Sequence, residues 1–233
     1  LRPFVELNPY REVLSKANEF VGYLPNAETV EPDTKLGLDD MFELVRKADE
    51  DYRTLQEKKE KLKQKIEEYR AKQQIVAPFR PLECDLHRVL HYRYITYRFG
   101  RIAVEFYHKM QKYLMDDLKA IFVEGERDES YVYGVYFVSQ AETQKVDAVF
   151  RSLHFERIEL KDEFEGTPDT AYRVLENEIA RVNLEIEDLD KQAGEMLADR
   201  APQLVAARDR LEELSNNFDV RKLAARMEDK QED

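Results

Sequence analysis

The chain has 233 residues, of which 37% are charged, and it contains only 7 Gly and 8 Pro. This composition favours long solvated helices over a single compact globule. The formal net charge of −12 argues against nucleic acid and anionic lipid as partners, because both select basic patches. No run of 18 apolar residues occurs, so no segment is a candidate membrane span. The chain begins with Leu rather than Met, and we expect it to be part of a longer protein.

The N-terminal part, residues 1–24, is predicted to form a short helix. Asn8 and Pro9 are suited to open it, because such residues are common at helix starts. Residues 25–37 contain two prolines and several acidic side chains, a composition that interrupts helices. We therefore expect a linker or bend between this helix and the next.

Residues 38–77 are predicted to form the first helix of a coiled coil. Apolar or small residues recur every seven positions, at Met41, Ala48, Leu55, Leu62, Tyr69 and Val76. A seven-residue repeat between Glu- and Lys-rich flanks is typical of a coiled-coil seam. A helix of this length needs a partner.

The partner is predicted in residues 167–228, which form a long return helix. Thr167 and Pro168 are suited to its N-cap and first position. Its apolar repeat shifts by one position beside Pro202, which removes an amide donor and predicts a kink there. When the two arms are aligned antiparallel, residues 25–37 fall near the level of Pro202. The short helix within residues 1–24 then pairs with residues 204–218. Residues 229–233 are expected to be a polar tail.

Between the arms, residues 78–166 are predicted to form an α/β lobe. Strand-like segments rich in β-branched and aromatic residues alternate with segments of helical periodicity. The expected strands are residues 91–100, 120–124, 131–138 and 155–160, and the expected helices are residues 103–118 and 141–153. This β-α-β-β-α-β order is that of a ferredoxin-like lobe. The predicted fold class is α+β, a long bent antiparallel coiled coil that carries this lobe at one end.

Catalytic motifs are absent from the sequence. No Gly-rich phosphate loop and no nucleophile elbow occurs, so we expect no active site, no cofactor and no small-molecule substrate. Cys84, His87 and His91 have spacings that a metal site can use, but no H-E-x-x-H pattern accompanies them. A linker into the first strand is the favoured interpretation, and we expect no metal.

An RNA-binding lobe is one alternative, because RNA-recognition motifs share this strand order and stack bases on aromatic side chains. Tyr92 and Tyr94 fall on the expected first strand, and Tyr131, Tyr133 and Phe137 on the third. The basic residue that opens the RNA-binding consensus is replaced by Val132, and the lobe has 13 basic against 16 acidic side chains. A generic cytosolic coiled-coil scaffold is the other alternative, and it ranks ahead of RNA binding.

Tyrosines of the lobe are the expected partner-binding residues. Tyrosine combines a large apolar area with a polar tip and is enriched at interfaces. Two helices are expected to cover one face of the sheet, which leaves the other face for water or a partner. The candidates are Tyr107 and Tyr113 at the lobe surface and Tyr131 and Tyr133 on the central strands, with residues 25–37 as a second contact region.

Short motifs in order along nearly the whole chain resemble one known family. They are Asn8-Pro9-Tyr10, Phe99-Gly100-Arg101-Ile102, Ala120-Ile121-Phe122-Val123, Tyr131-Val132-Tyr133-Gly134-Val135-Tyr136-Phe137, Lys145-Val146-Asp147, Phe155-Glu156-Arg157-Ile158, Glu165-Gly166-Thr167-Pro168 and Phe218-Asp219-Val220-Arg221-Lys222. This series is similar to the soluble domain of V-type ATPase subunit I, also called subunit a.

The resemblance implies a non-catalytic stator component at the cytoplasmic face of a membrane. In this family, proximal and distal lobes are joined by a bent coiled coil, and a C-terminal membrane domain forms ion half-channels beside the rotating ring. The predicted lobe corresponds to the distal lobe, which in the family meets peripheral stalk subunits E and G. This chain lacks the start of the proximal lobe and all membrane helices of the family.

Overall fold

The structure is a computed structural model that describes residues 7–161 and 163–232. Residues 1–6 of the predicted N-terminal segment and residue 233 of the predicted tail lie outside the described residues. The chain divides into two compact units, Leu1–Leu62 with Leu184–Asp233, and Lys63–Asn183. We describe each unit by itself.

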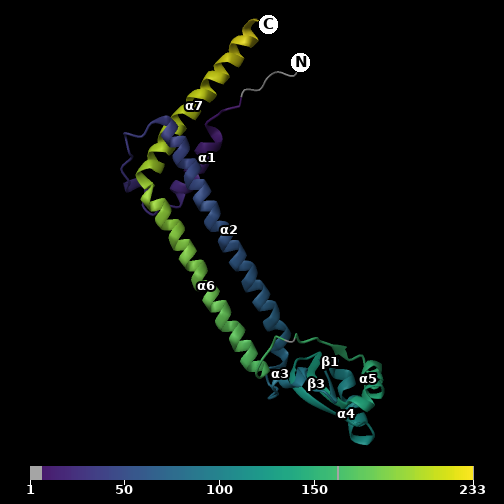
Figure 1. Cartoon of the computed structure of the whole chain (residues 1–233). Coiled ribbons are helices and arrows are strands. Elements are labelled where there is room, and N and C mark those ends of the chain that lie inside the picture. Colours follow the sequence, from purple (N-terminus) through teal and green to yellow (C-terminus); the bar gives the residue numbers. More distant parts are fainter. Residues whose placement is uncertain (1–6, 162, 233) are drawn as a thin grey trace. The chain divides into compact units, whose positions relative to one another are not determined.

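Helices dominate the chain, and one small sheet accompanies them. In order, the elements are α1 (Arg11–Gly22), η1 (Ala27–Thr29), α2 (Leu38–Val76), η2 (Ala77–Phe79), α3 (Leu86–Leu90), β1 (Ile95–Ala103), α4 (Val104–Asp116), β2 (Ala120–Arg127), β3 (Tyr131–Ser139), η3 (Gln140–Glu142), α5 (Thr143–Ser152), β4 (Glu156–Arg157), α6 (Pro168–Asp199) and α7 (Ala201–Glu232) (Figure 1). The predicted α+β class is confirmed, and the first coiled-coil helix has nearly its expected bounds.

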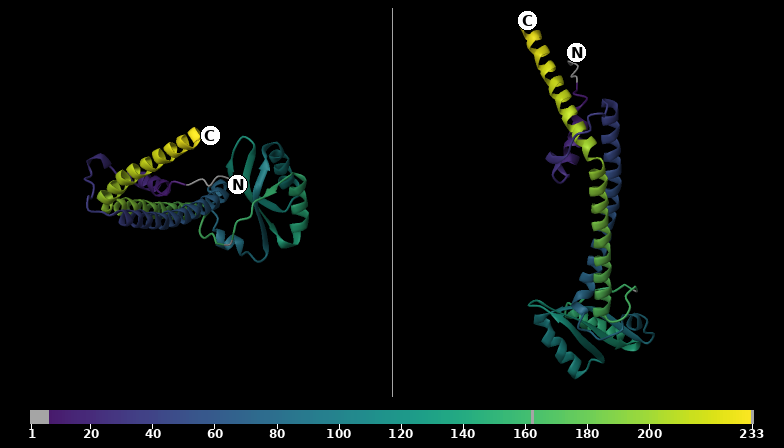
Figure 2. Two further views of the ribbon diagram at one scale, coloured as in Figure 1. Left: turned by 90° about the horizontal axis from the view of Figure 1, so that it is seen from above. Right: turned by 90° about the vertical axis from the view of Figure 1, so that its left-hand side faces the viewer.

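The first unit has a helical core in which α1 packs against α7. Phe20 of α1 is fully buried, as are Leu204 and Leu211 of α7. α1 contacts α7, and the two helices lie near each other when the structure is seen from above in Figure 2. The predicted pairing of the first helix with residues 204–218 is confirmed.

Asn8 opens α1 and also ties it to α7. Its Oδ1 accepts a 3.0 Å hydrogen bond from the backbone N–H of Tyr10, which satisfies a donor next to the helix start. Its Nδ2 donates to the carbonyl oxygen of Ser215 at 3.2 Å and to Oδ1 of Asp219 at 3.1 Å. One side chain therefore both starts the helix and fixes its packing.

The return helix is interrupted at Arg200, where α6 has ended at Asp199 and α7 begins at Ala201. Pro202 is the second residue of α7, and its ring removes the amide that would continue the hydrogen-bond ladder of α6. The linker meets this point, because the N–H of Asp33 donates to the carbonyl oxygen of Pro202 at 3.0 Å. Residues 229–232 are helical rather than a loose tail, since Glu, Asp, Lys and Gln can extend an exposed helix at little cost.

In both units α2 and α6 contact each other as antiparallel partners. In the first unit, Lys59 pairs with Asp190 at 2.7 Å and Arg200 with Asp51 at 2.8 Å. In the second unit, the buried Gln73 donates to Glu176 at 2.6 Å. The start of α6 follows the prediction, because Thr167 Oγ1 accepts from the N–H of Thr170 at 3.1 Å.

The second unit contains the predicted lobe. Its four strands are all paired antiparallel in the order β2-β3-β1-β4. With α4 and α5 as the connections, this is the ferredoxin-like arrangement, and the prediction is confirmed. Figure 2 shows α4 and α5 together on one side of the sheet.

Two strand boundaries differ from the sequence expectation. The first strand begins at Ile95 rather than at residue 91, so Tyr92 and Tyr94 lie before it. The last strand is two residues long instead of spanning 155–160. After β4, the N–H of Ile158 still donates to the carbonyl oxygen of Phe99 at 2.8 Å, and Leu160 and Phe164 are then buried in the same cluster as Phe99 of β1.

Gly100 lies inside β1 rather than at its end. A Cβ atom at this position would lie 2.2 Å from the carbonyl oxygen of Glu156 and 2.5 Å from the ring Cζ of Phe155. Glycine is therefore required by the close approach of residues 155–156, not by a turn.

Among the helices that the structure describes, none has the length and apolarity needed to cross a bilayer.

Candidate interaction surface

One face of the sheet is closed by α4 and α5. Its core contains Ile102, Val132 and Tyr136 from the strands and Met110, Val146 and Phe150 from the helices. The rings of Tyr136 and Phe150 stack with centroids 3.8 Å apart. This face is an ordinary apolar core and offers no surface to a partner.

A buried polar network crosses that core. Asp147 of α5 accepts a 2.6 Å hydrogen bond from the hydroxyl of Tyr136 and ion pairs with Arg98 at 3.3 Å and Arg157 at 3.1 Å. Burial, and next the hydrogen bond to Asp147, raise the pKa of Tyr136, so the phenol stays protonated. One carboxylate thus connects α5 to β1, β3 and β4.

The opposite face, which was expected to be open, is largely covered by the chain itself. Phe79 of η2 is fully buried, and its ring lies 5.2 Å from that of Phe99 on β1 and 6.3 Å from that of Tyr133 on β3. The same core takes in apolar side chains from the end of α2, from the segment between η2 and α3, from α3, from the segment after β4 and from the first turns of α6: Val76, Leu82, Leu86, Val89, Leu160, Phe164, Ala171 and Leu175.

This cover decides against base stacking on the central strands. Tyr133 and Phe137, the aromatics expected to be displayed, pack against the buried cluster. Gly125 of β2 leaves so little room under η2 that a Cβ atom there would lie 2.6 Å from the carbonyl oxygen of Pro78. An RNA-recognition motif needs this face free for bases, and in the second unit it is occupied.

Tyr131 and Tyr133 lie at the edge of the covered face, around Arg101. The guanidinium carbon of Arg101 lies 3.8 Å from the ring centre of Tyr131, and the group donates to Glu156 at 2.6 Å and to the hydroxyl of Tyr133 at 3.4 Å. The hydrogen bonds to Tyr133 and Glu156 raise the pKa of Arg101, which keeps it charged. Both tyrosines are half-buried.

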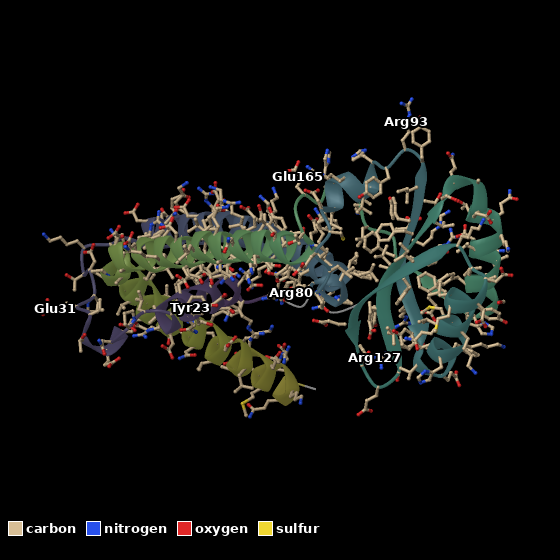
Figure 3. The ribbon with its side chains drawn as sticks, turned by 90° about the horizontal axis from the view of Figure 1, so that it is seen from below. Tyr23, Glu31, Arg80, Arg93, Arg127 and Glu165 are labelled. Atoms are coloured by element: carbon tan, nitrogen blue, oxygen red, sulfur yellow. The ribbon has the colours of Figure 1, made fainter. Side chains whose placement is uncertain are left out.

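Tyr107 is buried, although the sequence places it at the lobe surface. Only 8% of it is exposed, and its hydroxyl donates to Glu124 at 2.8 Å. Burial, and next this hydrogen bond, raise its pKa. The signal for burial is the spacing of Tyr107, Met110 and Leu114, which puts all three on one helical stripe. Arg127, seen at the end of the β2 strand in Figure 3, lies 4.8 Å from the Tyr107 ring.

Tyr113 is 42% exposed on α4. Because α4 covers one face of the sheet, Tyr113 lies on that side, whereas Tyr131 and Tyr133 lie on the other side. The four tyrosines do not form one surface. Of the four, only Tyr113 presents a large free area.

A more exposed aromatic surface than these four tyrosines lies just before β1, in residues that the sequence pattern predicts as part of the first strand. Tyr94 is 72% exposed, and Tyr92 and Ile95 are also exposed. Arg93 projects away from the ribbon at this point (Figure 3), with its guanidinium 6.0 Å from the Tyr94 ring. The sequence signal for this surface is a stretch with no Asp or Glu between Asp85 and Glu105, in which Arg and His accompany the tyrosines.

The candidate metal ligands Cys84, His87 and His91 lie before β1. In the part of the chain that the structure describes, no group of three or more His, Cys, Asp or Glu side chains is placed to hold a metal ion. The rings of His87 and His91 lie 4.6 Å apart on one side of α3. Burial raises the pKa of the half-buried Cys84 thiol, which favours its protonated form.

Comparison with solved structures gives a match along most of the chain. It is the crystal structure of the cytoplasmic N-terminal domain of subunit I, homolog of subunit a, of V-ATPase. The identity is 12%, the match covers 90% of this chain and 70% of that chain, and the TM-score is 0.50. No protein-family model and no curated protein sequence matches the chain. At this identity the likeness shows a shared fold.

Proposed function

We propose that this chain is a stator component of a rotary V-type ATPase or ATP synthase, the part of a subunit I-like protein that lies at the cytoplasmic face of the membrane. The observation that carries the proposal is the structural likeness to the subunit I domain over 90% of this chain. In this role the chain connects peripheral stalk subunits E and G to the membrane domain of its own longer protein, beside the rotating ring.

The way the lobe is attached to α2 and α6 supports a mechanical role. Arg80, just after η2, pairs with Asp169 at 2.9 Å, and its guanidinium lies 4.0 Å from the ring centre of Tyr172. Lys72 of α2 pairs with Glu163 at 3.1 Å. Together with the buried cluster around Phe79, these contacts resist rotation of the sheet relative to the helix ends within the second unit. A stator needs such stiffness, because its role is to withstand torque rather than to catalyse a reaction.

A binding experiment tests the proposal directly. The purified chain, immobilised, is incubated with purified stalk subunits E and G, and retention is measured. We expect the stalk subunits to be retained and their binding surface to map to the lobe. The matched variants are Tyr113→Ala, which tests the lobe at α4, and Lys59→Ala, which tests the coiled coil. If the stalk binds equally weakly to the chain and to an unrelated coiled coil, the proposal is wrong and a generic scaffold is favoured.

A second test concerns the gene. The coding sequence downstream of Asp233 is expected to encode several hydrophobic segments, as the membrane domain of subunit I requires. A stop codon directly after Asp233, in the natural gene, would contradict the proposal independently of any binding result.

A further inference from the structure

We propose that residues 87–95 form a docking surface for a short acidic protein segment that carries a bulky apolar side chain. We call this set of residues the basic loop. The inference does not require the stator role, since it rests on charge, exposure and shape in the second unit alone.

The charge of the basic loop is opposite to that of the chain as a whole. Arg88, Arg93, His87 and His91 are all exposed, and no Asp or Glu occurs between Asp85 and Glu105. The whole chain has a formal charge of −12. Asp85, the nearest carboxylate before the loop, is engaged as the N-cap of α3, where it accepts from the N–H of Arg88 at 3.2 Å. A positive surface on an acidic protein attracts acidic partners and orients them.

Large apolar groups accompany this charge. Tyr92, Tyr94 and Ile95 are exposed side by side in the sequence, and the backbone that holds them is fixed, because the N–H of Gln140 donates to the carbonyl oxygen of Tyr94 at 3.0 Å. Tyrosine and arginine are the residue types that most often carry binding energy at interfaces. An exposed cluster of both on an ordered backbone is what a docking surface requires.

A hollow of about 290 Å³ opens beside Ile95. Its lining is mixed: Ile95, Tyr97, Phe99, Ile158 and Leu160 supply apolar surface, Thr96 a hydroxyl, Arg98 and Arg157 positive charge, and Glu159 one carboxylate. It is large enough for one Leu or Phe side chain, which would be removed from water there with a gain of about 1.5–3 kcal/mol before the costs of binding. The partner is therefore expected to combine acidic residues with at least one bulky apolar residue.

The same features disfavour nucleic acid as the occupant. Affinity for a nucleic acid comes mainly from Lys and Arg side chains that neutralise phosphates, and the basic loop exposes only two arginines beside its two histidines. The sheet face that would stack bases is filled by Phe79 and its neighbours. A long polyanion would also reach the acidic remainder of the protein, which repels it, whereas a short acidic peptide would not.

The test uses a fluorescently labelled peptide rich in Glu that contains one Leu and one Phe, titrated with the whole chain at low salt. We expect saturable binding that weakens as salt is added. The double variant Arg88→Glu/Arg93→Glu is expected to weaken binding about tenfold or more, and Tyr94→Ala about threefold or more. The matched control is Lys109→Glu/Lys112→Glu on α4, which changes the net charge equally at another exposed site and is expected to bind within about twofold of the parent.

Three results would overturn the proposal: no binding of the peptide by the parent chain, equal loss in both double variants, or tighter binding of poly(U) RNA than of the peptide. The single variant Arg93→Gln provides a further measurement if the double variant fails to fold. Because Arg93 projects into solvent, this variant keeps the fold and is expected to weaken binding about threefold; unchanged affinity would contradict the inference.

Discussion

The backbone N–H of Asp33 donates a 3.0 Å hydrogen bond to the carbonyl oxygen of Pro202. It joins the linker between α1 and α2 to the point where the return helix is interrupted. Two breaks that are far apart in the sequence therefore meet in the first unit. If only one of the two helical arms were interrupted at this level, part of the apolar surface of the other arm would be left uncovered. Because the two interruptions meet, this is avoided.

Hydrogen exchange can detect this contact. We expect the amide of Asp33 to exchange at least about tenfold more slowly than that of Glu31, because a hydrogen-bonded amide exchanges only when its segment opens. Glu31 is the control, since it lies two residues away in the same exposed linker. Equal exchange rates at the two amides would show that the linker is not held at Pro202.

The pair formed by Asp51 and Arg200 predicts a pH dependence. The hydrogen bond from Arg200 lowers the pKa of Asp51 in the folded chain. A carboxylate with a lowered pKa contributes stability above its unfolded pKa of about 3.9, and this contribution is lost as the pH falls through the folded value. Asp51→Asn should thus lower the free energy of unfolding by about 1 kcal/mol or less at pH 7, and by less still near pH 2.

Urea denaturation at both pH values measures the effect. Glu213→Gln is the matched control, because it removes one negative charge from a pair with Arg210 that is more exposed. A loss for Asp51→Asn that is the same at both pH values would rule out the ionic origin of its contribution.

Phe79 is expected to be the most sensitive position of the covered sheet face. Phe79→Ala should lower the free energy of unfolding by about 3–5 kcal/mol, since it leaves a cavity among fully buried side chains. Ile121→Ala on β2 is the comparison, because Ile121 is 66% exposed and its loss should cost about 0.5 kcal/mol or less. Chemical denaturation of both variants checks this, and a mild effect of Phe79→Ala would mean that the face is not closed as described.

Gly100 and Gly194 predict opposite effects of one substitution. Gly100→Ala should destabilise the chain by about 1–3 kcal/mol, because the added methyl group meets the carbonyl of Glu156 and the ring of Phe155. Gly194→Ala should stabilise it by about 0.5–1 kcal/mol, since Gly194 lies inside α6 with nothing within 4 Å of an added Cβ. Thermal unfolding of the two variants gives the comparison, and shifts of the same sign would contradict it.

Local patterns in the sequence were enough to predict the long helices, the two helices of the lobe and the strand order, whereas α3 lies where a linker was expected. The seven-residue repeat from Met41 to Val76 predicts the extent of α2, because the spacing of apolar residues on a helix is a property of that helix alone. Thr167 and Pro168 predict the start of α6 for the same reason. The order of strands and helices restricts the lobe to few topologies, and the ferredoxin-like one was found.

Tertiary structure alone decided which surfaces stay free. Periodicity shows that Tyr133 and Phe137 share one face of the sheet, but it does not show that Phe79, from a segment far away in the sequence, covers that face. In the same way, no pattern within residues 155–160 shows that Leu160, together with Phe164, is buried in this cluster. The candidate interaction surface is therefore the basic loop rather than the aromatic side chains of the central strands. The physical reason is that burial depends on which segments meet, and packing between segments distant in the chain is not encoded in the spacing of residues within any one of them.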